Sequence, residues 1–349
     1  MSNNIAIIGL GQIGVSIGLA LKEKPGGARL MGSDKNPAAA RAAEIVGAID
    51  HVTGPREAVR DADLVILCVP LSEVRETLTK IGPALKEGSV VMETAPVKRQ
   101  IAEWMLDLVP QGRYFVGLVP AVTPDAIAGT DSGAHAARAD LFRRTVMVVD
   151  APRGTPPEVE QLATNLARLL GAKPMLADPL ESDGLMTTAH ILPQLTAAAL
   201  LQASIDRPGW LEARKLAGRP FAAVTGGLAY YDDPASLRLA AMGNPAVVVH
   251  ALDTMIAALK GMRDDIQNGD EDSLGDRLKD SFQARERWLD ERGTADWLKE
   301  GGDAVELPEL GEQVMQMLFG GRIVDRMKGQ LPGEPKRGAP GEKKKSRGK

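Results

Sequence analysis

Several features that would assign the sequence to a particular class are scarce. The 349 residues include one cysteine, Cys68, which excludes an internal disulfide framework and favours a reducing, cytoplasmic compartment. Aromatic residues make up 3%, too few for a surface that stacks single-stranded nucleic acid. No apolar run approaches the roughly 20 residues that span a bilayer. The opening "MSNNIAIIG" lacks the basic region of a secretory signal. We therefore expect a soluble protein without a membrane anchor, for which a nucleic-acid partner is improbable.

Metal-binding and nucleophile motifs are also missing. The sequence holds four histidines and no Cys/His cluster, so no structural zinc is expected. No phosphate-binding P-loop and no Gly-x-Ser-x-Gly elbow occurs. Cys68 lies within the apolar run "LVILCVP", which favours a small buried residue over a nucleophile. The chemistry must therefore come from other residues.

Charge is unevenly distributed behind the net value of −4. The last 19 residues carry seven Lys or Arg and two Glu, which leaves the rest of the chain acidic. Because this stretch is rich in Pro and Gly, we expect a disordered basic tail over residues 329–349. Such a tail could contact nucleic acid or an acidic partner, but a solvated tail with no defined partner is the simpler interpretation.

The hydrophobic pattern predicts two domains. Up to residue 178, short β-branched runs alternate with amphipathic helical stretches, as in a doubly wound (Rossmann-type) α/β domain whose parallel sheet is covered on both faces. The predicted strands are 4–9, 29–34, 63–70, 89–94, 114–120, 145–150 and 172–178. Residues 1–178 would thus form one domain.

From residue 179 to 328 the pattern predicts an all-α domain. The predicted helices are 180–206, 246–268, 271–298 and 308–327. The second of them is apolar around much of its circumference, so it must be buried. Because long apolar helices in a small domain often bury each other between subunits, we expect a homodimer formed through this domain.

A glycine-rich turn after the first strand predicts a dinucleotide site. Gly9, Gly11 and Gly14 have the spacing Gly-x-Gly-x-x-Gly, with Gln12 and Ile13 between them. The first glycine permits a tight turn, the second lets the backbone approach a pyrophosphate, and the third lets helix and strand pack closely. The N–H groups of the following helix would face the phosphates.

Two further positions belong to the same predicted site. Asp34 follows Gly14 by 20 residues, where a carboxylate would accept hydrogen bonds from the ribose hydroxyls and repel a 2′-phosphate. NAD is therefore the expected cofactor, although the positive charge of Lys35 would also allow NADP. Val69 and Pro70 end the third predicted strand, 63–70, and should pack near the cofactor.

The segment "ESDGLMTTAHILPQLTAAAL" contains a polar stripe on an otherwise apolar helix. At about 100° per residue, Asp183, Thr187, His190 and Gln194 share one face. Pro193 cannot donate to the carbonyl of the residue four positions earlier and leaves it free near the histidine. One interpretation is that the stripe satisfies itself within the core. The other, which we favour, places His190 at a substrate site. His51, His135 and His250 are weaker candidates, on an exposed loop, a surface helix, and a core or dimer interface.

These motifs together resemble the prephenate dehydrogenase family. The resemblance covers roughly residues 4–325 and rests on "GLGQIGVSIGLAL", "ADLVILCVP", "AGTDSG" followed by "ADLF", and "LPQLTAAAL". Members oxidise prephenate or arogenate with NAD(P) and release the ring carboxylate as CO2. The resemblance implies a histidine near the fifth strand, a serine after the fourth, and an arginine in the helical domain.

The sequence departs from the family at each of these three positions. Val119 stands where the histidine is expected, Pro96 where the serine is expected, and Gly226 where the arginine is expected. Lys98 of the serine-lysine signature is retained. A dianionic substrate without a guanidinium partner would bury a carboxylate unpaired, which costs several kcal/mol. The substrate pocket is therefore expected to differ from that of the family.

Three functional hypotheses follow. The first is an NAD(P)-dependent dehydrogenase with an altered pocket, in which His190 polarises the hydroxyl while Lys98 and Gln194 orient the substrate. Thr94 and Thr123 are weaker candidates. The second is a dinucleotide-binding sensor or assembly protein without turnover. The third is true prephenate or arogenate oxidation with His190 in the role of the missing histidine.

Overall fold

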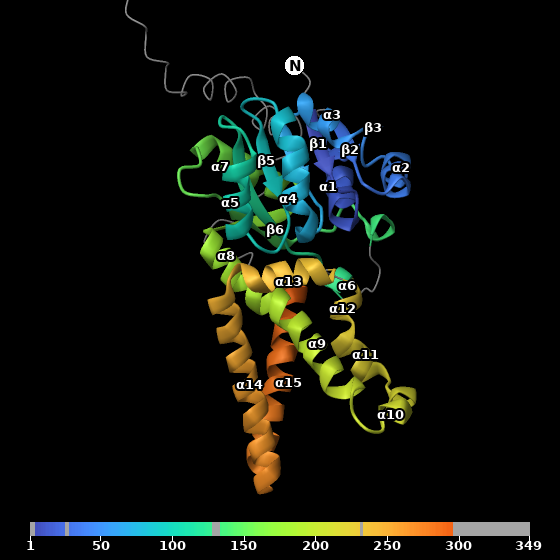
Figure 1. Cartoon of the computed structure of the whole chain (residues 1–349), viewed down its shortest axis with the longest axis vertical. Helices are drawn as coiled ribbons and strands as arrows, with labels where there is room; N and C mark the ends of the chain where they lie inside the picture. Colours follow the sequence, from blue (N-terminus) through green and yellow to red (C-terminus); the bar gives the residue numbers. More distant parts are fainter. Residues whose placement is uncertain (1–3, 25–27, 128–132, 231–232, 296–349) are drawn as a thin grey trace, which may run out of the picture.

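Residues 4–24, 28–127, 133–230 and 233–295 are described by the computed structural model (Figure 1). One sheet with its covering helices forms the upper body of the molecule, and helices alone form the lower part. The last strand ends at Ala177 and the first helix of the lower part begins at Pro179. The division into domains at residue 178 stays a prediction. The predicted helix 308–327 and the basic tail 329–349 lie outside the described residues.

The sheet has eight strands in the order β3-β2-β1-β4-β5-β6-β7-β8. Their bounds are β1 (Asn4–Ile8), β2 (Arg29–Ser33), β3 (His51–Val52), β4 (Leu64–Leu67), β5 (Val90–Glu93), β6 (Tyr114–Pro120), β7 (Thr145–Asp150) and β8 (Ala172–Ala177). The first six strands follow the order 3-2-1-4-5-6 of dinucleotide-binding domains. The predicted doubly wound fold is therefore confirmed, with the short exposed β3 as an addition.

The last two strands, β7 and β8, run opposite to the other six and depart from the expectation of an all-parallel sheet. β6 and β7 pair antiparallel, whereas all other neighbouring pairs are parallel. The physical reason lies in the connection. A parallel partner requires a crossover over one face, usually a long helix. The described part of the connection holds only α6 (Pro124–Ile127) and a 3₁₀ turn, Ala134–Ala136, so the chain reverses and pairs directly.

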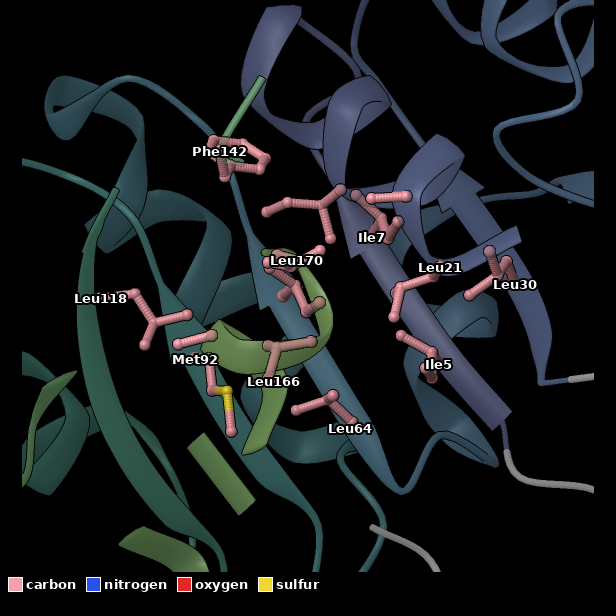
Figure 2. Packing of buried hydrophobic residues seen from close by; sticks show 14 of the residues in the cluster. Ile5, Ile7, Leu21, Leu30, Leu64, Met92, Leu118, Phe142, Leu166 and Leu170 are labelled. Atoms are coloured by element: carbon pink, nitrogen blue, oxygen red, sulfur yellow. The ribbon is translucent and has the colours of Figure 1, made fainter. Parts of the chain in front are cut away.

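Helices cover both faces of the sheet and create two hydrophobic clusters. In β1, Ile5 and Ile7 belong to one cluster while Ala6 and Ile8 belong to the other, as expected of successive residues in a buried strand. Figure 2 shows the first cluster, in which Leu166 packs with residues of several strands. The helices are α1 (Gln12–Lys22), α2 (Pro37–Ile45), α3 (Pro55–Arg60), α4 (Leu71–Ile81), α5 (Arg99–Leu108) and α7 (Pro157–Leu169).

The lower part is helical, as predicted, but more finely divided. The predicted helix 180–206 is α8 (Pro179–Met186), a π-helical turn (Thr187–Ile191) and α9 (Leu192–Ile205). The other helices are α10 (Trp210–Leu216), α11 (Arg219–Thr225), α12 (Gly227–Tyr230), α13 (Pro234–Gly243), α14 (Pro245–Asn268) and α15 (Glu271–Thr294). α13 packs on α4 and thereby joins the lower part to the sheet layer.

The expected burial of the long apolar helix is not found within the single chain. α14 pairs with α15, and the two project together from the body (Figure 1). Val248 is the buried residue of α14, whereas Val249, Ile256 and Ile266 are more than half exposed. Residues 179–205 and 245–268 are long and apolar enough to span a membrane, although composition alone is weak support because core helices share it.

Candidate active site

The glycine-rich turn has the geometry that a dinucleotide requires. Gly9 has φ of +96°, and a Cβ there would lie 2.3 Å from the carbonyl oxygen of Cys68. A Cβ on Gly14 would lie 2.0 Å from the carbonyl oxygen of Gly9. By contrast, a Cβ on Gly11 would meet no protein atom within 4 Å. The first and third glycines are therefore required by the fold, and the second leaves open space at the start of α1 for a ligand.

Asp34 lies beside this turn, at the end of β2. Its Oδ2 accepts a hydrogen bond from the N–H of Leu10 at 2.7 Å, and its Oδ1 accepts one from Asn36 at 2.7 Å. These bonds fix a carboxylate at the edge of the cleft. The ammonium of the neighbouring Lys35 is paired with Glu73, which raises the pKa of the lysine. The positive charge that could favour a 2′-phosphate is thus already engaged.

A large cleft connects the glycine-rich turn with the helical part. Its volume is about 1160 Å³, somewhat above the range of ordinary ligand pockets and large enough for a cofactor together with a substrate. Of the predicted cofactor residues, those lining the cleft are Gly9, Gly11, Gln12, Ile13, Asp34, Val69 and Pro70. Gly14 lies behind them and is buried. The amide of Gln12 donates to the carbonyl of Ala136 at 3.2 Å and so holds the 3₁₀ turn Ala134–Ala136 beside the glycine-rich turn.

His190 lies in the π-helical turn between α8 and α9 and lines the cleft, half-buried. The other side chains of the polar stripe form hydrogen bonds with backbone groups. Thr187 donates to the carbonyl of Asp183 at 2.8 Å, and the amide of Gln194 donates to the carbonyl of His190 at 3.1 Å. His190 thus lines the cleft, whereas Thr187 and Gln194 form hydrogen bonds with the helix itself, and the substrate role of His190 stays a prediction. Pro193 is the second residue of α9, just after the π-helical turn, where its missing N–H is accommodated.

Lys98 lies beneath the wall of the cleft and does not line it. Its ammonium is fully buried and donates to Oε1 of Glu93 at 2.5 Å, to the carbonyl of Ala95 at 2.6 Å and to that of Leu118 at 2.8 Å. These acceptors match the three protons of an ammonium group. Burial raises the pKa of Glu93, and the Lys98 ammonium opposes that shift. This geometry gives Lys98 contacts with the two strand ends rather than with a ligand.

A second acidic side chain, Asp150, lies close to the same lysine. The register aligns Glu93, Gly117 and Asp150 in one row across β5, β6 and β7, and the methylenes of Lys98 cover Gly117. Asp150 is fully buried, and among the described residues neither of its carboxylate oxygens has a hydrogen-bond partner. Burial raises the pKa of Asp150 to about 6, while Ser182 and Lys98 oppose the shift. Sequence reasoning missed Asp150, whose only signal was an acid at the end of an apolar strand.

The positions that depart from the family resemblance are distributed unevenly around the cleft. Pro96 and Val119 both line it, as does Thr94, whereas Gly226 ends α11 away from the lining. Thr123 is buried outside the lining. Of the other histidines, His51, His135 and His250 are all exposed in the single chain and none lines the cleft. Burial raises the pKa of the Cys68 thiol to about 12, which disfavours a thiolate at neutral pH.

One cleft residue that sequence reasoning did not single out is Asp233, which precedes α13. Its carboxylate accepts hydrogen bonds from Ala235, Ser236 and the hydroxyl of Ser72 on α4. These bonds lower the pKa of Asp233 although burial opposes them. The signal in the sequence was "DDPAS", an acidic cap before a proline at the first helical position. Asp233 adds a negative charge to the lining of the cleft.

A doubly wound sheet, a Gly-x-Gly-x-x-Gly turn with an acid at the end of β2, and a helical part beside the cleft are typical of dinucleotide-binding oxidoreductases. Comparison with known proteins narrows this class. Residues 17–176 match the family model described as prephenate dehydrogenase, nucleotide-binding domain. This match spans a little under half of the chain, and the comparisons support the prephenate dehydrogenase family.

Individual relatives agree with this assignment. The cyclohexadienyl dehydrogenase of Zymomonas mobilis is 27% identical over 286 residues, which cover 81% of this chain and 94% of the relative. The prephenate dehydrogenase of Lactococcus lactis is 30% identical over 205 residues, 58% of this chain and 54% of the relative. The crystal structure of A. aeolicus prephenate dehydrogenase with hydroxyphenyl propionate and NAD+ has a TM-score of 0.71 at 22% identity, covering 82% and 98% of the two chains. At that identity the structural likeness supports the fold.

Proposed function

We propose that the protein is an NAD-dependent dehydrogenase that oxidises a hydroxyl-bearing carbon and uses His190 as the group that binds and deprotonates the hydroxyl. The observation that carries this proposal is the position of His190. Of the four histidines, all of which the structure describes, it is the one that lines the cleft shared with Gly11 and Asp34. The expected dinucleotide site and the His190 imidazole therefore face the same cleft.

The residues present fit NAD. The open space at Gly11 would receive the pyrophosphate against the N–H groups of α1, whose first turn carries no acidic residue. Asp34 would accept hydrogen bonds from the ribose hydroxyls and would repel the additional phosphate of NADP. Bound there, the nicotinamide supplies the hydride acceptor. Val69 and Pro70 would pack beside it at the end of β4.

The role of the imidazole follows from acid–base chemistry. A neutral imidazole accepts the proton of the substrate hydroxyl while the hydride leaves the same carbon, so that a carbonyl forms. Where that carbon belongs to a ring that carries a carboxylate, CO2 can be lost, because the oxidised ring accepts the electron pair of the breaking bond. Gln194 contributes indirectly, since its amide holds the backbone carbonyl of His190.

The lining of the cleft favours a substrate with less negative charge than prephenate. In the described lining, four acidic side chains accompany two lysines, and Lys35 is already paired with Glu73. With Val119 and Pro96 on the wall and Lys80 as the remaining lysine of the described lining, a second substrate carboxylate would lose its hydration without a cationic partner of its own. We therefore infer a hydroxylated ring or small hydroxy acid with at most one anionic group.

The test is a titration with NAD and NADP followed by an assay of reduced-cofactor absorbance. The substrate panel contains prephenate, arogenate and small hydroxy compounds that carry two, one or no carboxylates. We expect tighter binding of NAD than of NADP, and the highest kcat/KM with a substrate of low charge. The names of the relatives favour prephenate or arogenate oxidation as a second candidate. Prephenate turnover as efficient as that of ordinary dehydrogenases would establish that candidate and overturn the altered pocket. Cofactor binding without any turnover would indicate a sensor.

Assembly and location belong to the same proposal. Exposed apolar residues lie along α14 and α15, among them Ile256, Leu259, Phe282 and Trp288. A second copy of the chain would cover this face, in line with the closed symmetry of most oligomers. We accordingly propose a homodimer through the helical part. A cytoplasmic location is proposed from the single free cysteine.

A further inference from the structure

Asp183 of α8 caps a helix to which it does not belong. Its Oδ1 accepts a hydrogen bond from the backbone N–H of Lys98 at 2.6 Å, and its Oδ2 accepts one from Arg99 at 3.4 Å. Lys98 precedes α5, which has no side-chain cap of its own and no acidic residue in its first turn. Because the first N–H groups of a helix lack intrahelical partners and favour negative charge, a carboxylate 85 residues away completes this terminus.

Few other placements of α8 relative to α5 would satisfy the Asp183 carboxylate equally well. Asp183 is 2% exposed, and burial raises its pKa while the N–H groups of Lys98 and Arg99 oppose the shift. A buried carboxylate that lost these donors would remain without compensation. The energy of the contact therefore depends on one relative placement of α8 and α5.

Hydrogen bonds hold the helical turns between Asp183 and His190. The carbonyl of Asp183 accepts the hydroxyl of Thr187 at 2.8 Å. The carbonyl of Thr187 in turn accepts the N–H of Leu192, which defines the π-helical turn. The imidazole thus lies seven residues from a fixed anchor and within a wound segment, and π-helical turns often mark functional positions.

The other side of the anchor is the wall of the cleft. The Lys98 side chain binds the carbonyls of Ala95 and Leu118, and the residues that directly follow these two line the cleft. Backbone and side chain of one lysine thereby connect the ends of β5 and β6 with α8. Asp183 itself does not line the cleft.

We propose that Asp183 is a positioning residue that sets the place of the His190 imidazole relative to the ends of β5 and β6. The catalytic meaning of this placement rests on the proposed function, whereas the placement itself does not. Asp183 acts through the helix terminus and touches neither cofactor nor substrate.

The experiment compares D183A with D183N and with D178A as a matched control. Asp178 is the cap of α8 itself, accepting hydrogen bonds from Leu180 and Glu181 at 2.9 Å, so its loss weakens the same helix without touching α5. Three quantities are measured: kcat with the best substrate, the Kd for NAD, and the rate at which diethyl pyrocarbonate modifies His190, followed by peptide mass mapping.

We expect D183A to lower kcat at least tenfold, to raise the modification rate of His190 at least threefold, and to leave the Kd for NAD within twofold. D183N retains an acceptor for the Lys98 N–H and should stay within threefold of the wild type in each quantity. D178A should lower the melting temperature and leave kcat and the modification rate unchanged.

Two results would overturn the proposal: D183A with kcat and His190 modification within twofold of the wild type, or D178A with the same effects as D183A. If D183A does not fold, T187V removes the next hydrogen bond without removing a charge, and an unchanged modification rate there would likewise count against it. A wild-type protein that binds NAD but turns over no substrate would refute the proposed function, while the modification rates would still decide the role of Asp183.

Discussion

Nζ of Lys98 lies 2.5 Å from Oε1 of Glu93, and both side chains are shielded from solvent. An ion pair in such a place is costly to assemble, because both charges lose their hydration, and it is costly to break, because the remaining charge is then unpaired. The bonds that Lys98 donates to two carbonyls and the bond that Glu93 accepts from the N–H of Ala95 offset the first cost.

Replacing Lys98 by Met should therefore destabilise the protein by about 3–5 kcal/mol, because Glu93 would remain buried and unpaired. The double variant with Glu93→Met should be more stable than K98M alone by at least about 1 kcal/mol. Urea unfolding of the three proteins measures both differences. A K98M protein within about 1 kcal/mol of the wild type would show that the pair has no such structural role.

The glycine-rich turn offers a pair of variants with opposite expectations. G14A should fold poorly, since its methyl group would lie 2.0 Å from the carbonyl oxygen of Gly9. G11A should unfold at nearly the wild-type temperature, since its methyl group meets no protein atom, yet its Kd for NAD should rise at least tenfold. Thermal unfolding and NAD titration separate the two effects. Unchanged NAD affinity in G11A would place the pyrophosphate elsewhere.

Asp150 predicts a dependence of stability on pH. Its pKa is raised by burial to about 6, so the folded state holds a proton that the unfolded state releases near pH 4. The stability from this group is complete below that lower pKa and is lost as the pH rises through 6. Relative to D150N, the wild type should therefore lose about 2 kcal/mol of unfolding free energy between pH 4 and 7. Urea unfolding at several pH values measures this difference, and a constant difference would contradict the raised pKa.

The exposed apolar face of α14 predicts the effect of a surface charge on assembly. I256D should shift a homodimer toward monomer, because a carboxylate would be buried against the partner. L106D, on α5 in the sheet layer, is the matched control, since Leu106 is equally apolar and highly exposed. Light scattering after size-exclusion chromatography gives the mass. A monomeric wild type, or a dimer that survives I256D unchanged, would contradict assembly through this face.

Much of the fold could be predicted because local pattern and tertiary burial agree. Ile5 to Ile8 form a continuous apolar run, since both faces of the sheet are covered, and the three glycines follow from the turn that they build. The antiparallel β6–β7 pair was not predicted, because the direction of a strand depends on its connection. The short helices α11 to α13 carry little periodicity and depend on contacts with α9 and α4.

The site was less accessible to sequence reasoning. Asp34 and His190 could be placed in the cleft from motif spacing and from the polar stripe. The role of Asp183 could not, because it depends on a contact with a segment 85 residues away, and the role of Lys98 could not, because it depends on where the ammonium points. A lysine next to a strand end has the same pattern whether its ammonium faces a ligand or a buried glutamate.

The most direct test of the account is the formation of NADH by the wild-type protein and by H190Q, measured with the best substrate of the charge-graded panel. Glutamine keeps a polar side chain but cannot accept the hydroxyl proton as a base. We expect the wild type to reduce NAD, and H190Q to bind NAD with unchanged affinity while kcat falls on the order of 10²–10⁴-fold. An H190Q protein with wild-type kcat would contradict the role of His190 at this site.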